Sequence, residues 1–478
     1  MRRRLLLGAR LLPLLIALVL SARDASAQKL TVQGDRFAVD GSPRFLVFMS
    51  FFGAMGAPQI EQDFKFLRSM GFDGVRIWPN LDTGPQLMNS DGSLKVSELQ
   101  RLKFILDKAR EQRLIVDVTF THEHVGMTMD AALTGIVNAT GELRAYENIL
   151  FDIQNERNVE DRRYMSEGDV DRIFRALKAV DPARIAFADN SLGQDWGPQY
   201  AADFTARLGL DVTALHESRR SQWYTFPFLR SIVDTMKANG RPVYLQEPNS
   251  TRDNTYEAND RADYYIQAVA NAKRAGAAAW CFHTQVAVNF GDGGPPTVEE
   301  RLRQWTEPEW NFVTSLKPRI NLRASNATNY VTAEGGGGGV VRADRPSAGP
   351  WEVMTIVNLT GGPLLSGDRI ALLGADGTHY WQAVGGGGAA LLASGTIIGP
   401  FETFVIERSD GNGVIRHGEP VTLRASTTPF YVLAESGGGG SVTVNSANRA
   451  AWETFMLLFA SPHSTDVAPG PLPFNARR

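Results

Sequence analysis

Two glutamates that each follow a short apolar run are the residues of this sequence best suited to act together. Glu156 lies just after the run 149–153, and Glu247 comes directly after the run 242–246. Short apolar runs of this kind predict strands buried on both faces, so both carboxyl groups are expected at strand ends. One carboxylate could attack an anomeric carbon while the other protonates the departing oxygen. Retaining glycoside hydrolysis requires such a pair about 5–5.5 Å apart.

The elements that must position this pair form a regular alternation of strands and helices. The predicted strands are 44–49, 74–78, 114–120, 149–153, 184–188, 210–215, 242–246 and 277–282, each followed by a helix-length segment. Eight such units favour a closed (β/α)8 TIM barrel. The first strand is not followed by a G-x-G-x-x-G motif, which argues against a dinucleotide-binding fold. Barrel active sites lie at the C-terminal strand ends, so the two glutamates are predicted to face each other across the barrel mouth.

The tripeptide His122-Glu123-His124 follows the third predicted strand and leaves an alternative open. An H-x-H spacing at a strand end suits a divalent metal ion, so a metal-dependent barrel hydrolase using His122 and His124 is a second interpretation. Such hydrolases carry this motif on their first strand, whereas here it follows the third. The preferred interpretation is therefore that His122 forms a hydrogen bond with a sugar hydroxyl.

The order in which these and further residues follow the predicted strands resembles glycoside hydrolase clan A, closest to its family 5 cellulase-like members. Asn155-Glu156 matches the clan's Asn-Glu acid/base motif on the fourth strand, and Glu247 matches the nucleophile on the seventh. Three further residues match the arginine that contacts the nucleophile, the strand-six histidine and the sugar-platform tryptophan, namely Arg76, His216 and Trp280. The resemblance spans the whole barrel and implies a retaining β-glycoside hydrolase acting on a polysaccharide or oligosaccharide.

One position departs from the family pattern. Family 5 members usually carry a tyrosine two residues after the strand-six histidine, and that residue here is Ser218. Tyr224, in the loop that follows, is expected to take its place in binding substrate. This departure bears on the particular family more than on the mechanism.

The implied double displacement needs no metal or organic cofactor. It requires Glu156 to be protonated and Glu247 to be ionised at the start of the cycle. The charge of Glu247 is expected to raise the pKa of Glu156, while Arg76 lowers the pKa of Glu247. Asn155 is expected to hydrogen-bond the 2-hydroxyl of the sugar, and Trp280 to stack on its ring. A carbohydrate-binding protein without turnover is a further alternative, although the presence of both glutamates argues against it.

After residue 318 the composition changes to strands and glycine, and the sequence repeats three times. Each repeat has a Tyr, a glycine run and then an aromatic–glutamate pair; the tyrosines are Tyr330, Tyr380 and Tyr431, spaced 50 and 51 residues apart. Three all-β units of this length resemble a β-trefoil of the fascin-like branch. The aromatic residues Trp351, Phe401 and Trp452 are expected to pack in its core around the pseudo-threefold axis. The alternative is that they stack on sugar, as in a carbohydrate-binding module.

Composition and the N-terminal residues complete the predicted organisation. The 478 residues include 49 Lys and Arg against 52 Asp and Glu, a net charge of -3 that gives no reason to expect a nucleic-acid partner. The single cysteine excludes internal disulfides. Three arginines, an apolar stretch and Ala25-Ser26-Ala27 predict a secretory signal peptide, hence a secreted or periplasmic protein with no membrane attachment after cleavage. The predicted segments are a signal peptide (1–27), the barrel (28–318), the β-trefoil (319–465) and a tail (466–478).

Overall fold

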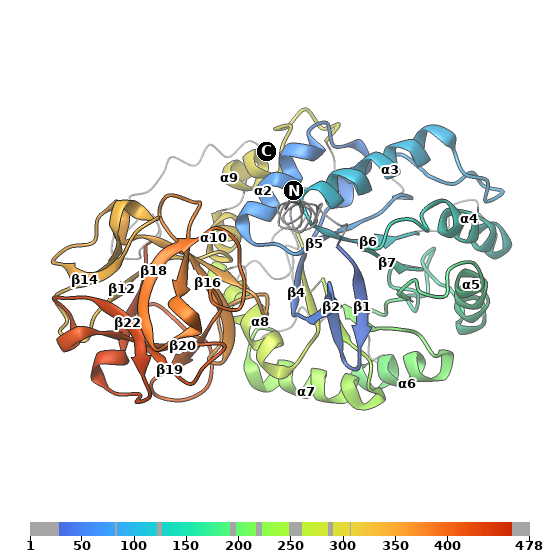
Figure 1. The fold of residues 1–478 in the computed structure, drawn as a ribbon. Coiled ribbons are helices and arrows are strands. Elements are labelled where there is room, and N and C mark those ends of the chain that lie inside the picture. The colour runs from blue at the N-terminus through green and yellow to red at the C-terminus, as the bar shows by residue number, and fades with distance from the viewer. Residues whose placement is uncertain are drawn as a thin grey trace, which may run out of the picture.

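The computed structural model describes residues 28–81, 84–121, 127–191, 197–216, 222–247, 261–284, 290–305 and 307–460. A parallel eight-stranded barrel surrounded by helices is followed by an all-β region that lies beside it (Figure 1). The predicted fold class, a (β/α)8 barrel followed by an all-β domain, is confirmed. The predicted signal peptide lies outside the described residues, and so do His122 and His124.

The barrel is formed by eight parallel strands in the order β8-β7-β6-β5-β4-β11-β10-β9. Their bounds are β4 Leu46–Ser50, β5 Gly74–Ile77, β6 Ile115–Thr119, β7 Ile149–Asp152, β8 Ala186–Phe187, β9 Thr213–His216, β10 Val243–Gln246 and β11 Ala279–Phe282. Backbone hydrogen bonds close the circle between the segments of β8 and β9. The N–H of Asp211 donates to the carbonyl of Ala186 at 3.1 Å, and the N–H of His216 to that of Asn190 at 2.9 Å.

Helices cover the outside of the barrel. They are α2 Ile60–Met70, α3 Val96–Glu111, α4 Met129–Glu142, α5 Glu167–Val180, α6 Pro198–Leu208, α7 Phe226–Met236, α8 Ala262–Ala275, α9 Val298–Trp305 and α10 Glu307–Ser315. The last helical segment of the barrel is divided into α9 and α10, because Pro308 lacks the N–H that would continue α9 and instead lies in the first turn of α10. Within the described ranges, no helix combines the length and apolarity needed to cross a bilayer.

The side chains of the barrel strands alternate between two apolar layers. One layer fills the barrel interior and includes Phe48, Tyr244 and Cys281. The other lies between the strands and the helices and includes Trp280 and Phe282. The interior layer is closed by the three-stranded sheet of β1 Leu30–Gln33, β2 Arg36–Val39 and β3 Ser42–Pro43.

The all-β region contains twelve strands in three successive groups of four. They are β12 Arg319–Arg323, β13 Tyr330–Ala333, β14 Val341–Arg345, β15 Met354–Asn358, β16 Asp368–Leu373, β17 Tyr380–Ala383, β18 Ala389–Gly395, β19 Phe404–Arg408, β20 Glu419–Ala425, β21 Tyr431–Ala434, β22 Val442–Ser446 and β23 Phe455–Phe459. Six of them pair in a closed antiparallel circuit, β12-β15-β16-β19-β20-β23. The other six form three hairpins, β13–β14, β17–β18 and β21–β22.

The glycine runs are structural parts of these hairpins. Gly336, Gly386 and Gly437 occupy equivalent positions and have φ values of 82°, 84° and 75°. These left-handed conformations strain any residue with a Cβ, which explains why glycine recurs at these positions. An aromatic ring lies against each glycine, and these rings are the side chains of Trp351, Phe401 and Trp452.

The expectation that these three rings pack in the core is wrong. Trp351, Phe401 and Trp452 are 47%, 42% and 51% exposed. The core around the circuit of strands is instead formed by smaller side chains such as Leu322, Ile370 and Val421. The glutamate that follows each ring is buried and holds the turn, so the ring itself faces solvent.

A buried lysine joins the two regions. Lys273 of α8 donates to Asp368 Oδ2 at 2.6 Å and to the carbonyls of Gly361 and Pro363 at 2.6 and 2.9 Å. Lys273 and Asp368 are each nine-tenths buried. Removing either partner would leave an uncompensated buried charge, so the pair couples the packing of the two regions. The short, glycine-poor connection between the regions predicts this packing.

Candidate active site

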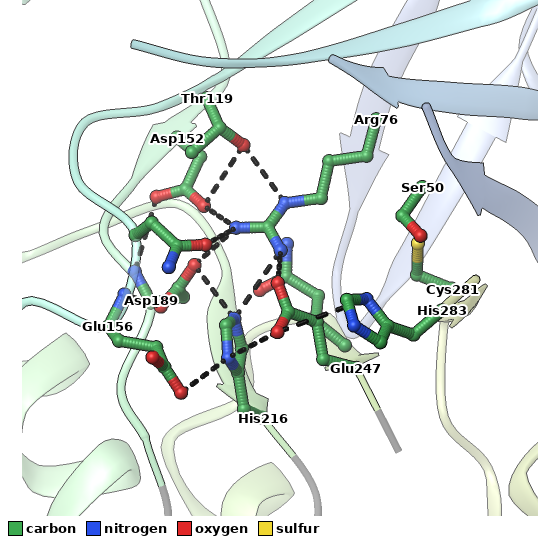
Figure 2. Close-up of polar contacts among 12 residues, drawn as sticks. Ser50, Arg76, Thr119, Asp152, Glu156, Asp189, His216, Glu247, Cys281 and His283 are labelled. Carbon is green, nitrogen blue, oxygen red and sulfur yellow. Dashed lines mark hydrogen bonds and ion pairs between the residues drawn. The ribbon is translucent and has the colours of Figure 1, made fainter. Parts of the chain in front are cut away.

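Arg76 lies at the centre of the residues that converge at the barrel mouth. It projects from β5, is fully buried, and is surrounded by side chains from five other strand ends (Figure 2). Its guanidinium donates to Thr119 Oγ1 (2.9 Å), Asp152 Oδ2 (2.8 Å), Asn155 Oδ1 (3.0 Å), Asp189 Oδ2 (2.5 Å) and Glu247 Oε1 (2.8 Å). Charge-assisted hydrogen bonds of this kind hold carboxylates in fixed orientations. Arg76 therefore fixes the positions of the groups around it.

The two glutamates predicted to do chemistry lie on opposite sides of one histidine. Glu247 directly follows β10, and Glu156 lies in the turn after β7. Nδ1 of His216 is 3.1 Å from Glu156 Oε1 and 3.3 Å from Glu247 Oε2. A carboxylate oxygen of each glutamate lies within 4.8 Å of the other. This distance is close to the separation of about 5–5.5 Å that retaining glycoside hydrolysis requires.

The backbone at both glutamates is left-handed, with φ of 47° at Glu156 and 44° at Glu247. A non-glycine residue in this region is strained, and such strain is often found where a side chain must be aimed at a site. At Glu156 the strained backbone is held because its N–H donates to Asp189 Oδ1. The same asparagine–glutamate turn places Asn155 against Arg76.

His216 is a charged group in this arrangement. Burial lowers the pKa of its imidazole, but the neighbouring carboxylates of Asp189 and Glu247 outweigh burial and raise the pKa to about 10. Nε2 lies 3.1 Å from Asp189 Oδ2, so each ring nitrogen faces a carboxylate. At neutral pH His216 therefore acts as a cation between the two glutamates.

The pKa of Glu247 agrees with the direction expected from sequence, and that of Glu156 does not. Burial raises the pKa of Glu247, but His216, His283 and Arg76 outweigh burial and lower it. Burial also raises the pKa of Glu156, yet the hydrogen bond and charge of His216 and the charge of Arg163 lower it to about 2. The repulsion expected from Glu247 is outweighed because two cations contact Glu156.

Three aspartates that the sequence analysis did not select complete the cluster. Burial and the nearby charge of Asp189 raise the pKa of Asp152 well above its ordinary value, and burial raises the pKa of Asp117 to about 7. For Asp189 the charges of His216 and Arg76 outweigh burial and lower the pKa. The pKa values of Asp152 and Asp189 are therefore shifted in opposite directions. Asp152 is the last residue of β7 and Asp189 directly follows the predicted strand 184–188, and a carboxylate at a strand end is the signal that could have identified both.

Trp280 and Tyr224 do not occupy the places expected of them. Trp280 is 0% exposed and packs on Phe312 of α10, with ring centroids 5.7 Å apart, in the layer between strands and helices. Alternation along β11 directs Cys281, not Trp280, toward the barrel interior. Tyr224 stacks on Tyr264 of α8 at 3.9 Å, so its contacts are with the helix layer and not with the glutamates. His122 lies outside the described residues.

A cavity with an aromatic wall adjoins the charge cluster. It has a volume of about 270 Å³ and is lined by residues that include Phe52, Met55, Trp78, Pro85 and Phe290. Phe52 stacks on Trp78 at 4.1 Å, and the Arg76 guanidinium lies 4.6 Å from the Trp78 ring. Trp78 itself is buried between Phe52 and Arg76, so the cavity wall combines aromatic rings with the edge of the charge cluster. Trp78 was missed although it directly follows β5.

Glu156, His216 and Glu247 are also spaced so that one metal ion could reach all three. Arg76 and Arg163, however, already supply positive charge to both carboxylates. The contacts that these three residues make here are therefore ion pairs with one another and with the two arginines.

No protein-family model matches this chain, and no curated protein matches it in sequence. Similar solved structures include a glycoside hydrolase family 5 protein from Bacteroides vulgatus, 12% identical over 80% of this chain and 91% of that chain, with a TM-score of 0.46. An endo-1,4-beta-mannanase from Rhizomucor miehei is 14% identical over 60% of this chain and 97% of that one, with a TM-score of 0.43. GH5_18 from Streptomyces cattleya, solved with GlcNAc, is 16% identical over 51% and 70%, with a TM-score of 0.40. These likenesses are distant, so the function of the site rests on the geometry of its own residues.

Proposed function

We propose that this protein is a secreted retaining β-glycoside hydrolase that acts on a polysaccharide or oligosaccharide. The observation that carries the proposal is the pair Glu156 and Glu247, at the ends of β7 and β10 with carboxylate oxygens within 4.8 Å. Double displacement uses carboxyl groups at about this short distance, whereas inversion needs room for a water between them. Secretion rests on the signal-like N-terminal residues.

In the proposed mechanism Glu247 is the nucleophile. Arg76 donates to its Oε1 and, with His216, keeps the carboxylate ionised, as attack on an anomeric carbon requires. Glu156 protonates the glycosidic oxygen as the sugar–oxygen bond breaks, and later accepts a proton from the water that releases the sugar. Asn155 turns its Oδ1 to Arg76, so its NH2 group is the end that donates to the 2-hydroxyl.

The test compares two variants on two kinds of substrate. Glu247→Ala should abolish turnover of every β-glycoside in a panel of aryl glucosides, mannosides, xylosides and galactosides. Glu156→Ala should keep activity on 2,4-dinitrophenyl glycosides, because that leaving group needs no acid, and lose it on glycosides with poor leaving groups. Equal loss on both kinds of substrate would contradict the assignment. EDTA should leave activity unchanged, and a loss that zinc restores would favour the metal-dependent hydrolase.

We further propose that the all-β region is a β-trefoil that holds polysaccharide. Three groups of four strands, with six strands in a closed circuit and three hairpins, support the trefoil. Three half-exposed aromatic rings at equivalent positions support binding, because such rings can stack on the apolar faces of sugars. Pelleting of the protein with insoluble glucans, mannans and xylans tests this role.

A further inference from the structure

Arg163 is a cation at the edge of the site that the proposed mechanism does not use. Its guanidinium donates to Oε2 of Glu156, while His216 lies 3.1 Å from Oε1 of the same carboxylate. Both oxygens of Glu156 therefore face a cation. A carboxylate held in this way has no proton to give, although the acid step requires one.

Arg163 is preorganised and can be reached from solvent. Asp161 orients it through contacts of 3.0 Å to Nε and 2.6 Å to the terminal nitrogen, and also accepts the backbone N–H of Arg163 at 2.8 Å. The side chain of Arg163 is 24% exposed, compared with 0% for Arg76. Arg163 can therefore exchange one anionic partner for another, which a fully buried arginine cannot do at low cost.

The position of Arg163 identifies the sugar that it would meet. Oε1 of Glu156 shares His216 with Glu247, so that side faces the sugar whose anomeric carbon Glu247 attacks. Arg163 contacts the other oxygen, Oε2. In the proposed mechanism, this is the oxygen nearer the sugar that departs.

We propose, on the basis of the glycosidase function above, that Arg163 is a specificity-determining residue that binds an anionic group on the leaving-group sugar. The group is a carboxylate or a sulfate ester, since the planar guanidinium fork matches both. When the substrate's anion takes over Arg163, Glu156 loses one of its two cationic partners and can take up one proton from hydronium or buffer acid in the solvent. Glu156 then donates that proton to the glycosidic oxygen. A neutral glycan offers no such exchange and is a poorer substrate.

Three matched disaccharides test this inference. All three have the same β-linked non-reducing sugar, chosen from the aryl glycoside panel. They differ only in the leaving-group sugar, whose exocyclic carbon is a hydroxymethyl group, a carboxylate or a sulfated hydroxymethyl group. The parent protein should prefer one anionic form by about tenfold or more in kcat/KM, and the preferred form identifies the anion. Arg163→Gln should lower kcat/KM for that form by about 10- to 100-fold, as expected for loss of a charged hydrogen bond. Arg163→Lys should restore part of the preference.

The neutral disaccharide provides a readout that a structural arginine would not change. Removing the charge raises the pKa of Glu156, so the basic limb of the pH–rate profile should move to higher pH in Arg163→Gln. Arg172→Gln, at an exposed arginine of α5 that pairs with Asp130, is the matched control and should keep the parent preference and profile.

The inference is overturned if Arg163→Gln keeps the parent's ratio of kcat/KM between the anionic and neutral disaccharides to within twofold. It is also overturned if the parent protein prefers the neutral disaccharide. Turnover of the 2,4-dinitrophenyl glycoside by the parent but not by Glu247→Ala shows that the glycosidase function stands in either case. If the parent cleaves no glycoside of the panel, the proposed function fails and the role of Arg163 fails with it.

Discussion

At the barrel mouth one buried arginine forms ion pairs with several carboxylates, whereas in the all-β region each buried glutamate accepts a hydrogen bond from the backbone of its own turn. Arg76 contacts Asp152, Asp189 and Glu247 at once. The buried glutamates of the three repeats instead accept one backbone N–H each, three residues earlier, at 2.7, 2.9 and 2.9 Å. The first arrangement is interdependent and the second is modular. A single substitution should therefore have large, coupled effects at the mouth and small, repeatable effects in the β region.

The largest expected effect is that of Arg76→Met. Loss of the guanidinium leaves buried carboxylates without their cation, which typically costs about 3–5 kcal/mol of unfolding free energy. The pKa of Glu247 should rise, so the acidic limb of the pH–rate profile moves to higher pH and kcat falls even on its plateau. Urea unfolding and the pH–rate profile measure both effects.

Arg342→Met in the β region is the matched control, because the Arg342 side chain is 42% exposed and pairs with Asp344 at 2.6 Å. It should cost less than about 1 kcal/mol, as surface ion pairs do. Comparable losses in the two variants would contradict the distinction between an interdependent mouth and a modular β region.

The second prediction concerns the pH dependence of stability. The folded-state pKa of His216, about 10, lies above its ordinary value of 6.5. Its contribution to stability is therefore fully present below pH 6.5 and is lost as the pH rises from 6.5 toward 10, up to about 5 kcal/mol in total. In His216→Asn this part of the decline should disappear from unfolding free energies measured between pH 6 and 10.

His417 of the β region, whose ring accepts the N–H of Phe459 at 2.9 Å, provides the comparison. The unfolding free energy of His417→Asn should decline with rising pH as that of the parent does. If His216→Asn also follows the parent, His216 is not charged in the folded protein.

A smaller effect is expected from the turn glutamates of the β region. Glu352→Ala and Glu453→Ala each remove one charge-assisted hydrogen bond from a backbone N–H, and each should cost about 1–2 kcal/mol. Glu402→Ala should cost somewhat more, because Glu402 also accepts a hydrogen bond from Gln382 at 2.7 Å. The three costs should add, since the sites are far apart in the repeat. Urea unfolding of the single, double and triple variants measures this; a single dominant site would contradict the modular description.

The smallest effect on stability is expected from the exposed rings. Trp351→Ala, Phe401→Ala and Trp452→Ala should each cost less than about 1 kcal/mol, because about half of each ring already faces solvent. The triple variant should nevertheless lose most of its pelleting with insoluble polysaccharide while keeping its turnover of soluble aryl glycosides. Ile397→Ala, at another exposed apolar residue of the region, should keep both. Unchanged pelleting of the triple variant would remove the proposed binding role of the rings.

The fold was predictable because its signals are local and repeated. Eight apolar runs with helices between them indicate a parallel barrel, and a repeat of about 50 residues indicates a threefold all-β unit. Strand ends were less certain, as β8 Ala186–Phe187 is shorter than the run that predicted it. The helix break at Pro308 was readable in the sequence, since proline cannot donate a backbone hydrogen bond.

For the candidate site, the sequence alone determined which residues stand at the strand ends, and so brought Arg76, Asn155, Glu156, His216 and Glu247 to one place. Only the tertiary structure decided which way Trp280 faces, because residues on a strand buried on both sides alternate between two apolar layers that composition does not distinguish. Only the structure brought Arg163 to Glu156, since Arg163 lies in an irregular loop without periodicity. The charge states were also decided in three dimensions. A pKa depends on burial and on charges from distant parts of the chain, and for Glu156 the two cations outweigh the neighbouring carboxylate.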